Sequence, residues 1–255
     1  MSKLSKVLLM ISFVFLIVGI SFAQDMKPDA AKLYNDGNSL LKEGNYSGAI
    51  KNYNQALVIE QDYRIYYQKG IALKKSGKLD EAKDAFEQAL KQKSDFEAGY
   101  NALGGVYFSL GNYLEAVKNF EKVVETTKNN TIKQMVQKNL SFAYSKIGNN
   151  EVADGNPKKA VEYLQKAVEN SNYDAAYLSL AKVYSDLGEY DKVIDAAQNA
   201  LKYRSSIGKG GPYYYLGLAY KNKGELDKAK EMFNQAKTDA TYKKLSEYEL
   251  ASLNN

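Results

Sequence analysis

The chain has 255 residues, of which 25% are charged and 45% hydrophobic, and its formal net charge is +5. This balance is typical of a folded soluble protein, and so mild a charge argues against a nucleic-acid-binding protein. The chain has no Cys and no His. Disulfides, thiolate nucleophiles, histidine bases and the usual zinc ligands are therefore excluded, and we expect no cofactor, no metal and no catalytic residue.

The first 23 residues have the layout of a secretory signal peptide. Two lysines precede an apolar run from Val7 to Ile20, and small residues occupy positions 21 and 23. This pattern predicts cleavage between Ala23 and Gln24. The apolar run is shorter than the roughly 20 residues that span a bilayer, so we expect no membrane span after cleavage. An uncleaved anchor helix is the alternative.

A turn motif recurs six times in the rest of the chain, at intervals of 33, 34, 44, 33 and 36 residues. Each copy begins with a glycine and has Ala or Val five positions later; the glycines are Gly44, Gly77, Gly111, Gly155, Gly188 and Gly224. Seven residues before each glycine stands a small residue: Gly37, Gly70, Gly104, Gly148, Ala181 and Gly217. Four residues after the Ala or Val stands a large residue, with Ala197 as the exception: Tyr53, Phe86, Phe120, Leu164 and Phe233. These offsets place the residues on one face of a helix, so each unit is predicted to hold two amphipathic helices.

The predicted fold is all-α, an α-solenoid of about six helix–turn–helix units over residues 30–243 with a capping helix and tail over 244–255. The units are expected to begin near residues 30, 63, 97, 141, 174 and 210. A left-handed glycine is expected to end each first helix. Residues 24–29 are interpreted as a linker in which Asp29 caps the first helix. Thr131–Leu140 is interpreted as an N-terminal extension of the fourth unit, Ser205–Pro212 as a loose connector, and the capping helix as polar.

This pattern is similar to the tetratricopeptide repeat, a helix–turn–helix unit of about 34 residues. Two features of that repeat are missing. Its proline at the end of the second helix is absent, and its frequent tryptophan is replaced by Leu33, Tyr66, Tyr100, Tyr144, Tyr177 and Tyr213. The resemblance implies that the first helices line a concave face and that this face binds peptide segments.

The register of the repeats places a set of aromatic, apolar, amide and basic residues on the concave face. Such side chains can hold an extended peptide by stacking and by hydrogen bonds to its backbone. The candidates are Tyr34, Asn38, Arg64, Tyr67, Ile71, Lys74, Asn101, Phe108, Asn149, Lys182, Tyr214, Leu218 and Lys221, and Leu41, Ser145, Leu178 and Ser185 share the register. A clamp for a C-terminal carboxylate, which the family also uses, is not predicted, because Tyr34, Ala98 and Ala102 stand where basic residues are needed.

The sequence favours an exported, non-enzymatic scaffold that binds a protein or peptide partner, periplasmic or extracellular, in the assembly of a bacterial envelope complex. Enzyme motifs fail, because Gly77-Lys78 and Gly208-Lys209 lack the upstream glycine of a phosphate loop and no Gly-x-Ser-x-Gly motif occurs. Two alternatives stay open. One is a glycan-binding protein or an accessory subunit of a cell-wall or polysaccharide enzyme, and the other is a self-assembling structural protein.

Overall fold

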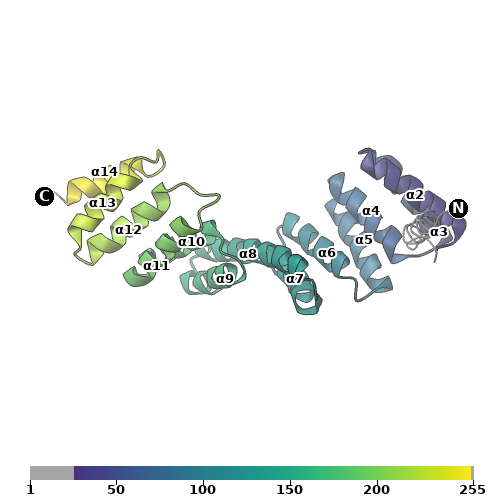
Figure 1. Ribbon diagram of the computed structural model, residues 1–255, viewed down its shortest axis with the longest axis horizontal. Coiled ribbons are helices and arrows are strands. Elements are labelled where there is room, and N and C mark those ends of the chain that lie inside the picture. The colour runs from purple at the N-terminus through teal and green to yellow at the C-terminus, as the bar shows by residue number, and fades with distance from the viewer. Residues whose placement is uncertain (1–25, 254–255) are drawn as a thin grey trace, which may run out of the picture. The chain divides into compact units, whose positions relative to one another are not determined.

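The computed structural model describes residues 26–253, which form helices and no β-strand. The predicted signal peptide lies outside the described residues. The helices follow one another along the chain (Figure 1) as α2 (Pro28–Lys42), α3 (Tyr46–Ile59), α4 (Tyr63–Lys75), α5 (Leu79–Gln92), α6 (Glu97–Ser109), α7 (Tyr113–Thr126), α8 (Asn130–Ala153), α9 (Pro157–Asn170), α10 (Asp174–Asp186), α11 (Tyr190–Lys202), α12 (Gly210–Asn222), α13 (Leu226–Ala236) and α14 (Lys243–Ser252).

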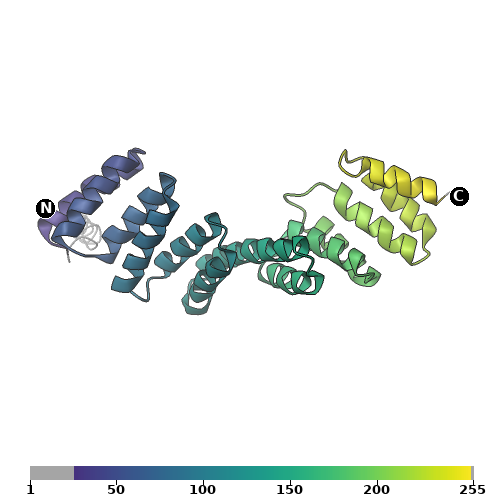
Figure 2. The same cartoon turned by 180° about the vertical axis from the view of Figure 1, so that it is seen from behind.

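The chain divides into two compact units, Met1–Val106 and Tyr107–Asn255, with the boundary inside α6. In the first unit, α2 packs on α3 and α4 packs on α5; in the second, α8 packs on α9, α10 on α11 and α12 on α13. Figure 2 shows these pairs from behind, with α14 beside α13 at the C-terminal end. The prediction of an all-α solenoid of helix pairs with a C-terminal helix is confirmed. The exact unit boundaries stay predictions.

The turn inside each pair has one conformation throughout the described chain. All six turn glycines have φ between 74° and 83°, a region that favours glycine because a side chain there is strained. After α2, the N–H of Gly44 bonds to the carbonyl of Leu41 and the N–H of Asn45 bonds to that of Leu40. These two bonds form a Schellman motif, which satisfies carbonyls that the helix end leaves unpaired. The same two bonds recur at the other five glycines.

The helices of a pair approach closely where glycine faces a large side chain. A Cβ built on Gly70 would lie 2.6 Å from Phe86 Cε1, and one on Gly37 would lie 2.6 Å from Tyr53 Cε1. Both rings are completely buried. In the fifth pair, where Ala181 replaces the glycine, the large residue is replaced by Ala197, and both alanines are completely buried. The two repeat positions, one on each helix of a pair, therefore face each other and together fill one buried space.

Helix α8 is longer than the other helices because it includes the extra residues before the fourth unit. It runs for 24 residues, and the side chain of Asn129 caps its start by accepting hydrogen bonds from the N–H groups of Thr131 and Ile132. Val136 and Leu140 in the extension are buried. The added turns are thus packed against the unit on one side.

The connector between α11 and α12 is tied to a buried aspartate. Asp174, the first residue of α10, has no exposed surface. Its Oδ2 accepts hydrogen bonds from the N–H groups of Ser205 and Ser206 at 2.6 Å and of Ile207 at 3.2 Å, and its Oδ1 accepts one from Ser206 Oγ at 2.7 Å. Burial by itself raises the pKa of the Asp174 carboxyl, but these hydrogen bonds outweigh it and hold the pKa well below its usual range. The expectation of a loose connector is wrong.

The start of the described chain differs from expectation in detail. Helix α2 begins at Pro28 with Lys27 at the N-cap position, so Asp29 lies inside the first turn and is not the cap, and the linker is shorter than predicted. At the other end, α14 exposes Leu245 and Tyr248 among its charged residues. None of the helices between residues 26 and 253 combines the length and the apolar character needed to cross a membrane.

Candidate functional site

The first helices of successive pairs contact each other within each unit, α2 with α4 in the first and α8 with α10 and α10 with α12 in the second. We call the surface of this layer that points away from the second helices the first-helix face. All predicted site residues lie on first helices. The unit boundary divides them into two sets, one ending at Asn101 and one beginning at Phe108, and each set is described by itself.

On α2, the two predicted residues contact the buried ring of the same pair. The Tyr34 ring lies 6.2 Å from that of Tyr53, and Tyr53 Oη donates a hydrogen bond of 2.8 Å to Asn38 Oδ1. Burial, with a contribution from Tyr34, raises the pKa of Tyr53 strongly. The Asn38 carbonyl is therefore engaged, and its amide N–H₂ group is the part that remains to bind a partner.

On α4, Arg64 and Tyr67 are held by neighbouring side chains. Arg64 Nε and Nη2 donate to the two carboxylate oxygens of Asp62 at 2.9 Å and 2.8 Å, and Asp62 also caps α4 by accepting from the Arg64 N–H. The Tyr67 ring lies 5.7 Å from that of Phe86 and 5.0 Å from that of Phe96. Burial raises the pKa of Tyr67. Both residues therefore stabilise the stack, whatever they contribute to binding.

The other candidates of the first unit lie further along its first-helix face. Ile71 and Asn101 are half-buried. A Cβ built on Gly105 of α6 would lie 3.1 Å from Lys74 Nζ, so the lysine reaches from α4 to the next first helix. Partial burial lowers the pKa of the Lys74 ammonium. An ammonium with reduced hydration gains more from an added carboxylate than a fully hydrated one does.

The candidates of the second unit differ in exposure. The Phe108 ring lies 5.3 Å from that of Tyr113 in an edge-to-face arrangement. Asn149 and Lys182 are exposed. Ser145 is 4% exposed, so its assignment to an open face is wrong. Ser145 stands three residues before Gly148, as Tyr67 stands three before Gly70. Tyr67 points toward the next helix pair, where its ring contacts Phe96. A side chain as short as serine at this repeat position is covered by the next pair.

In the sixth pair, the predicted residues contact the C-terminal helix. Tyr214 lies 5.5 Å from the ring of Tyr242, which precedes α14. Lys221 Nζ is 2.6 Å from Glu249 Oε2 and 2.9 Å from Ser252 Oγ, both on α14. Leu218, which lies between Tyr214 and Lys221 in the sequence, is half-buried. Tyr214 and Lys221 thus hold the end of the stack, and their use by a partner stays a prediction.

The structure adds two exposed apolar residues on α8 that the sequence reasoning missed. Phe142 is 42% exposed and Met135 is 47% exposed. The Phe142 ring meets that of Tyr173 edge to face, with 4.8 Å between their centroids. A signal was available, because Phe142 stands six residues before Gly148, as Arg64 stands six before Gly70. Met135 lies one heptad earlier, in the extension, which has no counterpart in the other units.

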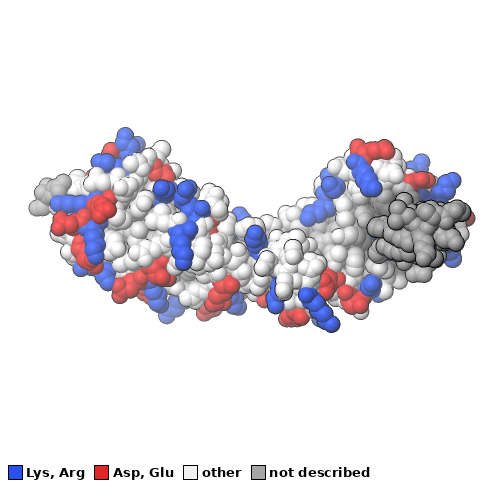
Figure 3. Space-filling model, in the orientation of Figure 1, with Lys and Arg blue, Asp and Glu red and all other residues white. Residues whose placement is uncertain are grey.

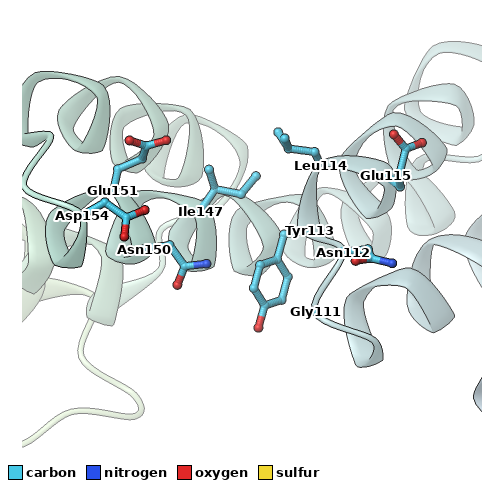
Figure 4. A pocket seen from close by; sticks show the side chains of 9 residues that line it. All are labelled: Gly111, Asn112, Tyr113, Leu114, Glu115, Ile147, Asn150, Glu151 and Asp154. Carbon is cyan, nitrogen blue, oxygen red and sulfur yellow. The ribbon is translucent and has the colours of Figure 1, made fainter.

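A separate groove of about 460 Å³ lies between the start of α7 and the C-terminal part of α8. Tyr113, Ile147 and Asn150 surround the opening (Figure 4), and Glu115, Glu151 and Asp154 line it as well. Glu115 is paired with Lys118, and Glu151 accepts a hydrogen bond from Asn156. The groove is therefore mildly acidic and unlike the lysine-bearing first-helix face.

Charged groups within the described residues are dispersed. Figure 3 shows acidic and basic side chains interspersed on the face in view, with mostly uncharged surface in the middle where α8 lies. Between residues 26 and 253, no three acidic side chains converge on a point where they could hold a metal ion. The surface of the described residues therefore consists of packed helices that present both polar and apolar side chains.

A stack of antiparallel helix pairs with a repeated glycine turn defines the class of helical repeat proteins. Models of the tetratricopeptide repeat match residues 67–130, 174–206 and 211–238, and a model described as TPR repeat matches residues 37–77. The chain belongs to the tetratricopeptide repeat family. A TPR repeat-containing protein of Methanocaldococcus jannaschii is 29% identical over 245 residues, which cover 86% of this chain and 40% of that protein. This chain thus spans about two fifths of the length of that relative.

Solved structures support the same fold. The crystal structure of YrrB, described as a TPR protein with an unusual peptide-binding site, has a TM-score of 0.51 and 23% identity, and the match covers 77% of this chain and 96% of that one. The structure of a MamA double mutant also has a TM-score of 0.51, with 20% identity and coverage of 70% and 96%. At these identities the likeness shows the fold alone.

Proposed function

We propose that the chain is an exported, non-enzymatic interaction scaffold that binds a segment of a partner protein on its first-helix faces and helps to assemble a complex of the bacterial envelope. Proteins of the tetratricopeptide repeat family generally act as interaction scaffolds without enzymatic activity. The observation that carries the proposal is the mixture of exposed side chains on one layer of helices, such as Lys182, Asn149 and Phe142 in the second unit.

The chemistry of this face suits a polypeptide segment. Lysine and asparagine side chains can bond to carboxylates and backbone carbonyls, while exposed rings supply apolar contact. Because the helices are fixed by buried pairs such as Gly70 and Phe86, the face needs little ordering when a partner binds. A preformed surface loses less conformational entropy on binding than a flexible one.

Export is the second part of the proposal. It rests on the sequence of the first 23 residues, which has the layout of a signal peptide. Fractionation of cells that express the full chain tests it. We expect the protein outside the cytoplasm with Gln24 as its first residue, as measured by N-terminal sequencing or intact mass. A cytoplasmic protein that retains residues 1–23 would contradict export and leave the binding proposal open.

The binding proposal is tested by cross-linked capture from native cells with charge-reversal variants. Lys74→Glu and Lys182→Glu change the first-helix faces, and Lys91→Glu on α5 and Lys159→Glu on α9 are matched changes at exposed positions of second helices. We expect a partner that the wild type and both control variants recover and that one of the first-helix variants loses. Recovery that is equal for all four variants would place the interface elsewhere.

A further inference from the structure

Helix α8 lies in a segment with an unusual charge distribution. From Thr126 to Asn150 the chain has four lysines, Lys128, Lys133, Lys138 and Lys146, and no Asp or Glu. Most second helices differ in that they carry acidic residues. Helix α5, for example, has four: Asp80, Glu81, Asp84 and Glu87. The long first helix of the fourth pair therefore presents only positive charge over most of its length.

Four residues of α8 form a continuous stripe on its exposed side. Met135, Lys138, Phe142 and Lys146 are spaced by three, four and four residues, which places them on one helix face. All four are exposed, and the two apolar ones keep 47% and 42% of their surface. The opposite side of the helix, with Leu140 and Tyr144, is buried in the unit. We call these four residues the α8 stripe.

We propose that the α8 stripe docks an acidic amphipathic helix of a partner protein. Met135 and Phe142 are two turns apart, which matches the spacing of apolar side chains at i and i+7 on a facing helix. Lys138 and Lys146 flank this apolar seam, where they can pair with carboxylates that border the apolar face of the partner helix. The inference deepens the proposed scaffold function by naming the chemistry of the partner segment.

A second copy of this chain does not satisfy the α8 stripe. Pairing of two α8 helices would bring lysines against lysines, which is destabilising. The acidic helix α5 of another copy could supply carboxylates, but its apolar residues Ala82, Ala85, Phe86 and Ala89 are already buried in its own unit. Helix α14 of another copy exposes Leu245 and Tyr248, but it begins with Lys243 and Lys244, and its Glu249 is already paired with Lys221. A longer acidic helix with a free apolar face, from another protein, therefore fits the α8 stripe better than either helix of a second copy.

The test uses synthetic 21-residue peptides and the mature full chain. The first peptide has Leu at helical i, i+3, i+4 and i+7 spacing and Glu at most other positions. The second has Lys in place of each Glu, and the third is the first with its residues scrambled to remove the periodicity. Dissociation constants are measured by fluorescence anisotropy at low and high salt, with anionic phosphatidylglycerol vesicles as a separate arm.

Two variants change the stripe and two match them elsewhere. Met135→Ser/Phe142→Ser removes the apolar seam and Lys138→Glu/Lys146→Glu reverses its charge. The controls are Val58→Ser on α3, which is 87% exposed, and Lys158→Glu/Lys159→Glu on α9. Circular dichroism confirms that each variant is folded. Met135→Ser alone replaces the double variant if loss of the Phe142 contact with Tyr173 impairs folding.

We expect the periodic acidic peptide to bind, more weakly at high salt, and each stripe variant to weaken it about tenfold or more while the controls do not. Equal binding of the three peptides, or equal effects of stripe and control variants, would overturn the proposal. So would stripe-dependent binding to vesicles without binding to the acidic peptide. If capture of a native partner still depends on Lys74 or Lys182, the scaffold function survives the failure of this inference.

Discussion

The second and the fifth helix pairs fill the same buried space with different side chains. In the α4–α5 pair, a whole phenylalanine ring lies against a glycine, and a Cβ on Gly70 would be 2.6 Å from Phe86. In the α10–α11 pair, two alanines, Ala181 and Ala197, take these places and are both completely buried. In both pairs the two facing residues, one from each helix, are buried together where the helices cross. The effect of substituting one of the two residues therefore depends on which residue faces it.

The two pairs also use an aspartate differently at the start of the first helix. Asp62 caps α4 and binds Arg64 two residues later, so its contacts are local. Asp174 begins α10 and binds backbone groups of a connector 31 residues away. The second pair is thus fixed by a large side chain between its helices, and the fifth pair carries a buried charge that fixes the next connector.

The largest expected effect comes from removing the ring in the second pair. Phe86→Ala should lower the free energy of unfolding by about 3–5 kcal/mol, because the ring is fully buried and glycine cannot fill the cavity. Urea unfolding followed by circular dichroism measures the loss, and hydrogen exchange of α4 and α5 localises it. A loss below about 1 kcal/mol would show that the second pair tolerates an unfilled crossing point.

The buried aspartate should give the next largest effect. Asp174→Asn keeps the shape but removes the charge that accepts several hydrogen bonds, so we expect a loss of about 3 kcal/mol at neutral pH. The pKa of the Asp174 carboxyl is held below its ordinary value in the folded state. Its contribution is therefore complete above the unfolded pKa of about 3.9 and declines as the pH falls toward the folded pKa.

The measurement for Asp174 is urea unfolding of wild type and variant at a series of pH values. The difference between the two proteins should narrow as the pH falls from about 5 to about 2. Asp186→Asn, at an exposed position of the same helix, is the control and should show little difference at any pH. A gap between wild type and Asp174→Asn that stays constant over this range would show that charge is not what fixes the connector.

A change of sign is expected for Gly70→Ala. In the wild type the added methyl group meets Phe86, and the clash should cost about 1–2 kcal/mol after the gain in helix propensity is subtracted. In the Phe86→Ala background the same substitution rebuilds the arrangement of the fifth pair and should stabilise by about 1 kcal/mol. A double-mutant cycle with urea unfolding gives both values. Equal effects in the two backgrounds would contradict joint filling of the space.

The smallest effect is expected at the local aspartate. Asp62→Ala removes the cap of α4 and the partner of Arg64, and it should cost about 1 kcal/mol. Thermal unfolding monitored by circular dichroism measures the change, with Asp62→Asn as the control, because asparagine also caps a helix. A loss as large as that of Asp174→Asn would remove the distinction between the two aspartates.

Much of the fold was predictable because it depends on residues close in sequence. The glycine turns need only local bonds, as between Gly44 and Leu41, and helical offsets expose the columns that pack between the helices. The tie between Asp174 and Ser206 was not predictable, because a lone aspartate at a helix start is usually a surface residue. Its burial arises only when a distant connector folds over it.

The candidate site was less predictable than the fold. The repeat register correctly places residues on first helices, but it does not tell which of them a neighbouring element covers. Ser145 is buried, and Lys221 binds Glu249 of α14, because an end helix and the next pair occupy space that the register leaves open. Phe142 was missed because four of the five other residues at its repeat position are small, namely Ala31, Ala98, Ala175 and Gly211, so the repeat pattern predicts no large side chain there.

The six turn glycines have one further consequence. A Cβ placed on Gly44, Gly77, Gly111, Gly155 or Gly224 would meet no other atom within 4 Å, so these positions impose no limit on size. Their positive φ makes them selective for handedness alone, and an L-alanine at each would cost roughly 1 kcal/mol through its own backbone. A D-amino acid prefers the backbone conformation that these glycines adopt and also restricts the unfolded chain. At the turns of this repeat protein, stability is therefore limited by the fact that natural amino acids are L-residues, which disfavour a positive φ.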